Sequence, residues 1–202
     1  MDVKQTILAR RAYRSLDPLE ITLDLIRDLA ESAQLAPSCN NNQPWRFVFA
    51  YDPGVLKKLH ATFDKGNEWM RASSMIIAVL SNRQYDCIVK DRIYYNFDTG
   101  MSVGFLILRA TELGLVAHPV AGYNEESVKE ILGIPKDLIV ITLINIGKHS
   151  NTISQVLSEK QVKSEKQRPE RKPLEQFTYL NSYKTPWQGQ EIPHLAAGRD
   201  MN

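Results

Sequence analysis

Residues 37–45 read PSCNNNQPW and are the most informative part of this chain. Asn41 and Gln43 carry side-chain amides that offer both hydrogen-bond donors and acceptors, and the two prolines stiffen the backbone around them. Successive asparagines are also typical of a plain turn, because asparagine tolerates a left-handed backbone and caps helices. The Gln-Pro-Trp that follows favours a ligand site, because a bare turn needs no specific amide followed by a large aromatic anchor. We expect Trp45 itself to serve in packing.

A second concentration of chemistry lies upstream in RRAYR, residues 10–14. Each guanidinium presents a rigid fork of donors and stays protonated near neutral pH, which suits a phosphate. Arginines at the end of a helix can also simply complement the helix dipole. The apolar spacing of residues 3–8 predicts a helix ahead of this run. On a continuing helix Arg10 and Arg14 share a face, so we expect them to bind phosphate, whereas Arg11 points elsewhere.

The two runs resemble the motifs of the FMN-dependent nitroreductase family, which read approximately R-R-S-x-R and P-S-x-x-N-x-Q-P-W. The second match is the stronger, with its spacing intact at Pro37, Ser38, Asn41, Gln43, Pro44 and Trp45. The first departs at Ala12, where the family usually has a serine, so one hydroxyl contact to the flavin is missing. The resemblance extends to PVAG, residues 119–122, and to RKPLE, residues 171–175, and so covers most of the chain.

The resemblance implies an α+β fold in which helices flank a central, mostly antiparallel sheet, assembled as an intertwined homodimer with two interfacial flavins. It implies one domain over residues 1–202, with residues 150–202 as an extension that reaches the flavin phosphate and wraps the partner subunit. Residues 179–187 are the candidate wrapping segment. Composition alone indicates only a mixed globular chain, since 43% of the 202 residues are hydrophobic and 24% are charged.

The residues that the resemblance assigns to FMN come from four parts of the chain. Guanidiniums from both ends are expected at the phosphate: Arg10, Arg14 and Arg171. The middle motifs are expected to address the ring system: Ser38, Asn41 and Gly122. Some relatives carry an acidic residue at the position of Ala121, and that carboxylate is missing here. The full expected cofactor-binding set is Arg10, Arg11, Ala12, Arg14, Pro37, Ser38, Cys39, Asn41, Gln43, Pro119, Val120, Ala121, Gly122 and Arg171.

The implied activity is an FMN-dependent oxidoreductase that uses NAD(P)H to reduce nitroaromatic, quinone or similar electron-poor small molecules by ping-pong hydride transfer. No catalytic side chain is expected, because the flavin carries the hydride. No Rossmann or P-loop motif occurs, so the nicotinamide is expected to bind transiently. The same motifs leave open a flavin-dependent reductive dehalogenase, a flavin-cleaving enzyme or a low-turnover flavin redox sensor.

Charge and cysteine content disfavour other classes. A formal net charge of +2 is too small to indicate a nucleic-acid partner, and the basic residues 159–172 indicate a solvated connector. Cys39 and Cys87 are too few for a disulfide scaffold or a zinc site, no histidine has metal-ligand spacing, and no metal is expected. These features and the strand-sized apolar runs predict a soluble cytoplasmic protein with no membrane segment and no signal peptide.

Hydrophobic periodicity predicts the remaining elements. Helices are expected over residues 25–33, 53–63, 91–113 and 125–132, the last of these capped by Asn124 and ended by Gly133. Strands are expected over residues 46–51, 75–80 and 138–146, with 75–80 buried on both faces in the middle of the sheet. Gly100 and Gly104 lie on one face of the longest helix, where either internal packing or close packing across a dimer axis explains them.

Overall fold

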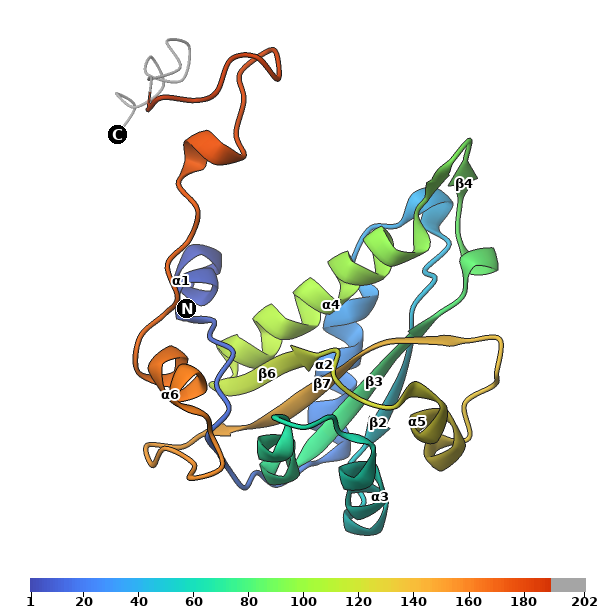
Figure 1. Cartoon of the computed structure of the whole chain (residues 1–202). Coiled ribbons are helices and arrows are strands. Elements are labelled where there is room, and N and C mark those ends of the chain that lie inside the picture. Colours follow the sequence, from blue (N-terminus) through green and yellow to red (C-terminus); the bar gives the residue numbers. More distant parts are fainter. Residues whose placement is uncertain (190–202) are drawn as a thin grey trace. The chain divides into compact units, whose positions relative to one another are not determined.

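The computed structural model describes residues 1–189, and the chain divides into two compact units, residues 1–167 and residues from 168 on (Figure 1). The helices of the first unit are α1 (Val3–Ala9), α2 (Leu23–Gln34), α3 (Pro53–Leu59), α4 (Tyr95–Glu112), α5 (Glu125–Leu132) and α6 (Glu159–Lys166). Its strands are β1 (Leu16–Asp17), β2 (Arg46–Ala50), β3 (Met75–Ser81), β4 (Ile88–Val89), β5 (Arg92–Ile93), β6 (Leu115–Val120) and β7 (Ile139–His149).

Strand β7 organises the sheet, because β3 pairs with one of its edges and β6 with the other. Strand β2 extends the sheet beyond β3, and β1 pairs with the last two residues of β7. Every strand pairing among residues 1–189 is antiparallel. The α+β prediction is confirmed, and so is the central position of β3, whose seven residues are all buried.

Two apolar cores lie on opposite faces of this sheet, because successive side chains of a strand point to opposite faces. Met75, Ile77 and Val79 of β3 belong to the core under α2 and α4. Ile76 and Ala78 belong to the core that contains residues of α3 and α5. The continuous apolar run of β3 therefore reflects helices packed on both faces.

The ends of the helices follow local sequence signals. Asn124 accepts a hydrogen bond from the Ser127 N–H at 2.8 Å, and Gly133 ends α5 with a φ of 64°, as predicted. The prediction was wrong at the start of α4, which begins at Tyr95. Residues 88–93 instead form the β4–β5 hairpin, in which Lys90 takes a φ of 57°.

The prediction of a solvated connector was wrong for residues 159–166, which form α6. Ser158 begins this helix with a capping box: its Oγ accepts the Gln161 N–H, and Gln161 Oε1 accepts the Ser158 N–H. Glu165 on this helix is buried, with 7% of its surface exposed.

In the second unit Leu174–Gln176 form a 3-10 turn and Tyr179 pairs with Pro186. The rest of the predicted extension, residues 190–202, lies outside the described residues. Across residues 1–189, no helix combines the length and apolarity needed to cross a membrane.

Candidate functional site

The arginine run is not helical, because α1 ends at Ala9 and Arg10 takes an extended backbone with φ −56° and ψ 120°. The Arg11 guanidinium points to α6 and donates to the carbonyl oxygens of Ser164 and Glu165 at 2.8 and 3.1 Å. Arg10 and Arg14 instead lie close enough to the His118 ring to lower its pKa. Arg11 therefore points away from Arg10 and Arg14, as predicted, although these residues are not helical.

Arg14 is a half-buried guanidinium suited to an anion. Burial lowers its pKa, and the nearby Glu165 only partly opposes that shift. The Glu165 carboxylate accepts the backbone N–H groups of Arg14 at 2.8 and 3.1 Å and of Ser15 at 3.2 Å. Among the described residues, no carboxylate forms an ion pair with the Arg14 guanidinium. A phosphate would offset its desolvation, so these residues fit a phosphate-bearing cofactor.

His118 of β6 holds the arginine run against the sheet. Its Nδ1 lies 3.0 Å from the Tyr13 carbonyl oxygen, and its ring stacks on Trp69 with centroids 4.6 Å apart. Burial, together with the nearby Arg14 and Arg10, lowers its pKa to about 4, although the hydrogen bond to Tyr13 opposes this shift. The ring is therefore neutral at physiological pH, with the proton on Nδ1 facing the carbonyl. The sequence contains no local signal for this role or for that of Glu165.

Residues 119–122 form the end of β6, as predicted, and the irregular segment that follows it. Pro119 and Val120 are the last residues of β6, and Ala121 is exposed. The Gly122 carbonyl accepts hydrogen bonds from the Asp64 N–H at 3.1 Å and from Asn67 Nδ2 at 3.0 Å. A Cβ at Gly122 would collide with Asn67 Nδ2, so residues 64–67 explain why this position is glycine.

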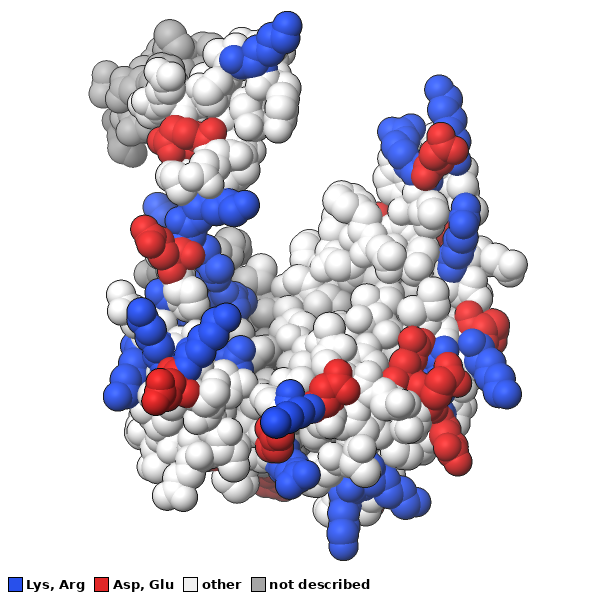
Figure 2. Space-filling model, in the orientation of Figure 1, with Lys and Arg blue, Asp and Glu red and all other residues white. Residues whose placement is uncertain are grey.

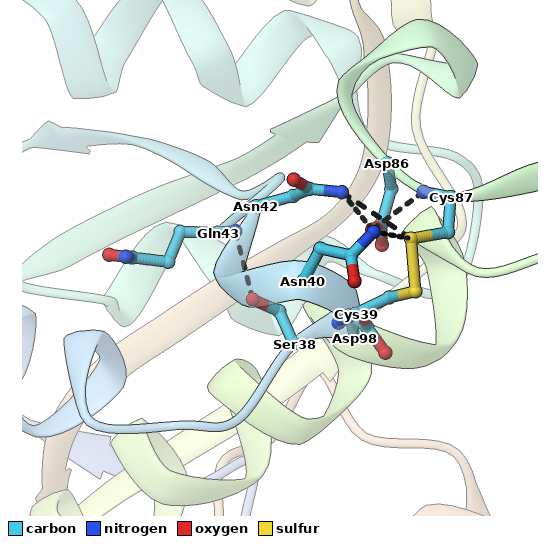
Figure 3. The surroundings of a disulfide bond; sticks show 8 residues. All are labelled: Ser38, Cys39, Asn40, Asn42, Gln43, Asp86, Cys87 and Asp98. Atoms are coloured by element: carbon cyan, nitrogen blue, oxygen red, sulfur yellow. Dashed lines mark hydrogen bonds between the residues drawn. A yellow bond between two sulfur atoms is a disulfide. The ribbon is translucent and has the colours of Figure 1, made fainter.

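The loop of residues 37–45 contains an unusual concentration of left-handed backbone. Asn40, Asn41 and Gln43 have φ values of 50°, 57° and 48°. Ser38 Oγ accepts the Gln43 N–H at 2.9 Å (Figure 3). Asn41 Oδ1 accepts from Gln43 Nε2 at 3.1 Å. Such conformations cost about 1–3 kcal/mol each and cluster at ligand sites. Trp45 is buried beneath the loop, as expected of a packing residue.

Cys39 forms a disulfide with Cys87, although the low cysteine content pointed away from disulfides. Its sulfur is therefore not a free thiol facing a cofactor. Its backbone N–H donates to Asp98 Oδ2 at 2.6 Å, at the start of α4. The disulfide joins residues that are 48 positions apart, so no local sequence pattern predicts it.

Within one chain the expected cofactor residues fall into separate groups. Tyr13 and His118 join residues 10–14 to β6 and the turn at 119–122. The loop of residues 37–45 instead bonds to the first turn of α4 and to residues 86–87. Figure 1 shows this loop and the arginine run in different parts of the first unit. Arg171 lies in the second unit, and its assignment to the phosphate stays a prediction.

Comparison with known proteins gives matches over most of the chain. The family model described as the nitroreductase family matches residues 7–64 and 60–148. A candidate NADH dehydrogenase/NAD(P)H nitroreductase of Archaeoglobus fulgidus is 30% identical over 149 residues, which cover 70% of this chain and 82% of that protein. An iodotyrosine deiodinase of Haliscomenobacter hydrossis is 24% identical over 166 residues, which cover 68% of this chain and 75% of that protein.

Solved structures share the fold. A crystal structure described as an oxidoreductase containing FMN has a TM-score of 0.77 at 25% identity, covering 89% of this chain and 92% of that one. A nitroreductase family protein from Clostridium difficile 630 has a TM-score of 0.72 at 21% identity, covering 92% of this chain and 99% of that one.

Proposed function

Because this chain belongs to the nitroreductase family, we propose that it is an FMN-dependent oxidoreductase that uses NAD(P)H to reduce nitroaromatic, quinone or similar electron-poor acceptors. The observation that carries the proposal is the half-buried Arg14 guanidinium, which is desolvated and forms no ion pair with a carboxylate among the described residues. The FMN named for a solved relative of 25% identity supports the choice of cofactor. When bound, FMN supplies hydride transfer from the nicotinamide to the acceptor.

The protein's own residues bind and orient the cofactor. Arg10 and Arg14 hold the phosphate, and Glu165 fixes the backbone that carries Arg14. Neutral His118 adds no positive charge, so the arginines alone balance the anion. At the opposite end of the cofactor, side-chain amides and backbone groups contact the ring system: Ser38, Asn41, Gln43 and Gly122. No catalytic side chain is required of the protein, since these residues position the reacting groups.

The test compares Arg14→Ala with Arg27→Ala, a matched loss of an exposed arginine on α2. The purified wild-type protein should be yellow and release a chromophore with the mass of FMN. It should oxidise NADH or NADPH repeatedly when a nitroaromatic or quinone is supplied. Arg14→Ala should lose most of its flavin, whereas Arg27→Ala should keep it. Full flavin retention by Arg14→Ala would show that the phosphate assignment is wrong.

We also propose a homodimer formed through α4. Helix α4 buries Leu106 and Ala110 against the sheet, yet Phe97 and Phe105 on its other side are 63% and 43% exposed. A Cβ built at Gly100 or Gly104 meets no atom within 4 Å, so internal packing does not explain these glycines. Figure 2 shows an almost uncharged surface over α4. Such an apolar face is typical of a subunit interface, and a second copy there would unite the separate groups of cofactor residues.

Reductive dehalogenation is a second candidate, favoured by the similarity to an iodotyrosine deiodinase. The two activities differ in product, since dehalogenation releases halide whereas nitro or quinone reduction does not. Halide release from a halotyrosine, measured beside quinone turnover with the same enzyme preparation, separates them. Rapid halide release with negligible quinone turnover would favour the dehalogenase.

A further inference from the structure

The Cys39–Cys87 disulfide joins the loop that precedes β2 to the segment that follows β3 (Figure 3). Cys39 lies in the loop of residues 37–45, and Cys87 immediately precedes the β4–β5 hairpin. Both cysteines are partly exposed, so a small thiol can reach the bond. The chain has two cysteines in all, so the pair has no competing intramolecular partner.

The two sulfurs have different surroundings. Cys87 Sγ lies 3.5 Å from Asn40 Nδ2 and 3.5 Å from Asn42 Nδ2, and both amides donate to it. Donors of this kind stabilise a thiolate, and a stabilised thiolate is the better leaving group in thiol–disulfide exchange. No such pair of donors faces Cys39 Sγ among the described residues. An attacking thiolate therefore displaces Cys87 most readily when it attacks Cys39.

The two segments are also held independently of the bond between the sulfurs. The Cys39 N–H donates to Asp98 Oδ2 at 2.6 Å, and Asn42 Nδ2, in the same loop, donates to Asp86 Oδ1 beside Cys87 at 3.2 Å. Both carboxyl groups are buried, with 1% of Asp98 and 9% of Asp86 exposed. These contacts hold the two backbones close together after the sulfurs separate. The bond can therefore open and close again without unfolding of the chain.

Opening the bond releases a constraint on a strained loop. Gln43 keeps a left-handed backbone with a φ of 48°, and its N–H donates to Ser38 Oγ within the loop that the disulfide holds. Left-handed backbone of residues other than glycine and asparagine persists only where the surroundings enforce it. Loss of the covalent link therefore lets residues 39–43 relax.

We propose that Cys39–Cys87 is a reversible thiol–disulfide exchange site that accepts electrons from a dithiol and controls the conformation of residues 39–43. The exchange itself is independent of the flavin, whereas its effect on cofactor binding rests on the proposed function. Control acts through Asn41 and Gln43, which lie in the same loop and are assigned to the flavin ring.

The exchange proceeds in two balanced steps. One sulfur of the dithiol attacks Cys39 Sγ, the bond between the two cysteines breaks, and Cys87 leaves as a thiolate. The second sulfur of the dithiol then attacks the first, which releases Cys39 as a thiolate and closes a cyclic disulfide. Two electrons pass from the dithiol to the protein, and the two protons of the dithiol end on the two cysteine thiols.

The experiment uses the full chain under native conditions in buffers of reduced and oxidised dithiothreitol at graded ratios. EDTA is included because Asp86 lies within 4.8 Å of both sulfurs and could join two thiolates in binding a metal ion. Acid-quenched samples are alkylated and their free thiols counted by intact mass. We expect two thiols to appear and disappear together and reversibly, with an unchanged circular dichroism spectrum. Labelling that requires denaturant, or loss of the folded spectrum on reduction, would overturn the proposal.

Two further measurements test the mechanism. Asn40→Gly removes one donor to Cys87 while keeping the left-handed backbone, and it should slow reduction about threefold or more, because the leaving thiolate is less stabilised. Gln84→Ala removes an exposed amide from the same segment and should leave the rate unchanged. Amide exchange of residues 38–45 should accelerate on reduction, and equal exchange in both states would refute control of the loop.

The thiol count and the amide exchange rates can both be measured whether or not the protein binds flavin. A colourless protein with a reversible disulfide would therefore refute the proposed function alone. An inert disulfide in a yellow, active protein would refute only the exchange site.

Discussion

Buried His118 links the stability of the protein to pH. Burial and the neighbouring arginines lower its pKa from 6.5 to about 4, so between these values the unfolded chain binds a proton that the folded chain does not. The free energy of unfolding therefore falls as the pH drops through this window and levels off below it. The full contribution is on the order of 3 kcal/mol. Urea midpoints at pH 7 and pH 4.5 should differ more for the wild type than for His118→Leu, and equal differences would contradict this account.

Gly122 is a position where adding a single carbon atom should destabilise the protein. The Cβ of Gly122→Ala would displace the Asn67 side chain and disturb its bond to the Gly122 carbonyl, at a cost of about 1–3 kcal/mol. Chemical denaturation measures the loss. In an Asn67→Ala background the same substitution should cost much less, because the colliding atoms are absent. Equal costs in both backgrounds would show that some other contact excludes alanine.

Individual residues show which features the sequence could predict. Asn124 and Gly133 were correctly assigned as the caps of α5, because a helix cap depends on residues within one turn. Glu165 and His118 were missed, because they contact the arginine run from positions more than 100 residues away. Local periodicity carries no information about such contacts.

Among the helices and strands, α4 is the one through which we expect the homodimer to form. Gly104→Gln places a side chain where no atom of the same chain lies within 4 Å, so the subunit should gain about 0.5 kcal/mol from better helix propensity. The same side chain blocks close approach of a second helix. Light scattering should therefore show a monomer, and circular dichroism should show that this monomer remains folded. Lys57→Gln on α3 is the surface control and should stay dimeric, and a dimeric Gly104→Gln would place the interface elsewhere.

The elements also show why some patterns were misread. The apolar rhythm of α4 correctly predicted a helix, but the rhythm includes both the buried residues and the exposed Phe97 and Phe105. Periodicity does not distinguish a side chain buried in the same chain from one reserved for a partner. Helix α6 was missed because its polar composition resembles a connector, although Ser158 and Gln161 hold the spacing of a capping box.

At the scale of the whole molecule, the proposed dimer predicts complementation between two damaged chains. Arg14→Ala removes a residue proposed to bind the flavin phosphate. Asn41→Gly removes a side chain proposed to contact the flavin ring, and glycine tolerates the left-handed backbone at this position. If each site takes these groups from different subunits, a mixed dimer contains one site with both lesions and one intact site. It should therefore bind about half of the wild-type flavin, whereas each variant homodimer binds little.

Two differently tagged chains, co-expressed and purified through both tags, provide the mixed dimer, and the ratio of flavin to protein is the measurement. A mixed dimer with as little flavin as the variant homodimers would show that both groups come from one subunit.

The family and the antiparallel sheet were predictable because short motifs with fixed spacing identify them. The disulfide and the α6 contacts were not, because each joins segments that are distant along the chain.

The place of β7 between β3 and β6 has a consequence for biosynthesis. Residues 139–149 are made after both neighbours, so the newly made chain carries two open strand edges until β7 leaves the ribosome. Chains arrested shortly before residue 139 should accordingly be cleaved rapidly by added protease and associate with chaperones. Release of a few dozen further residues should abolish both behaviours.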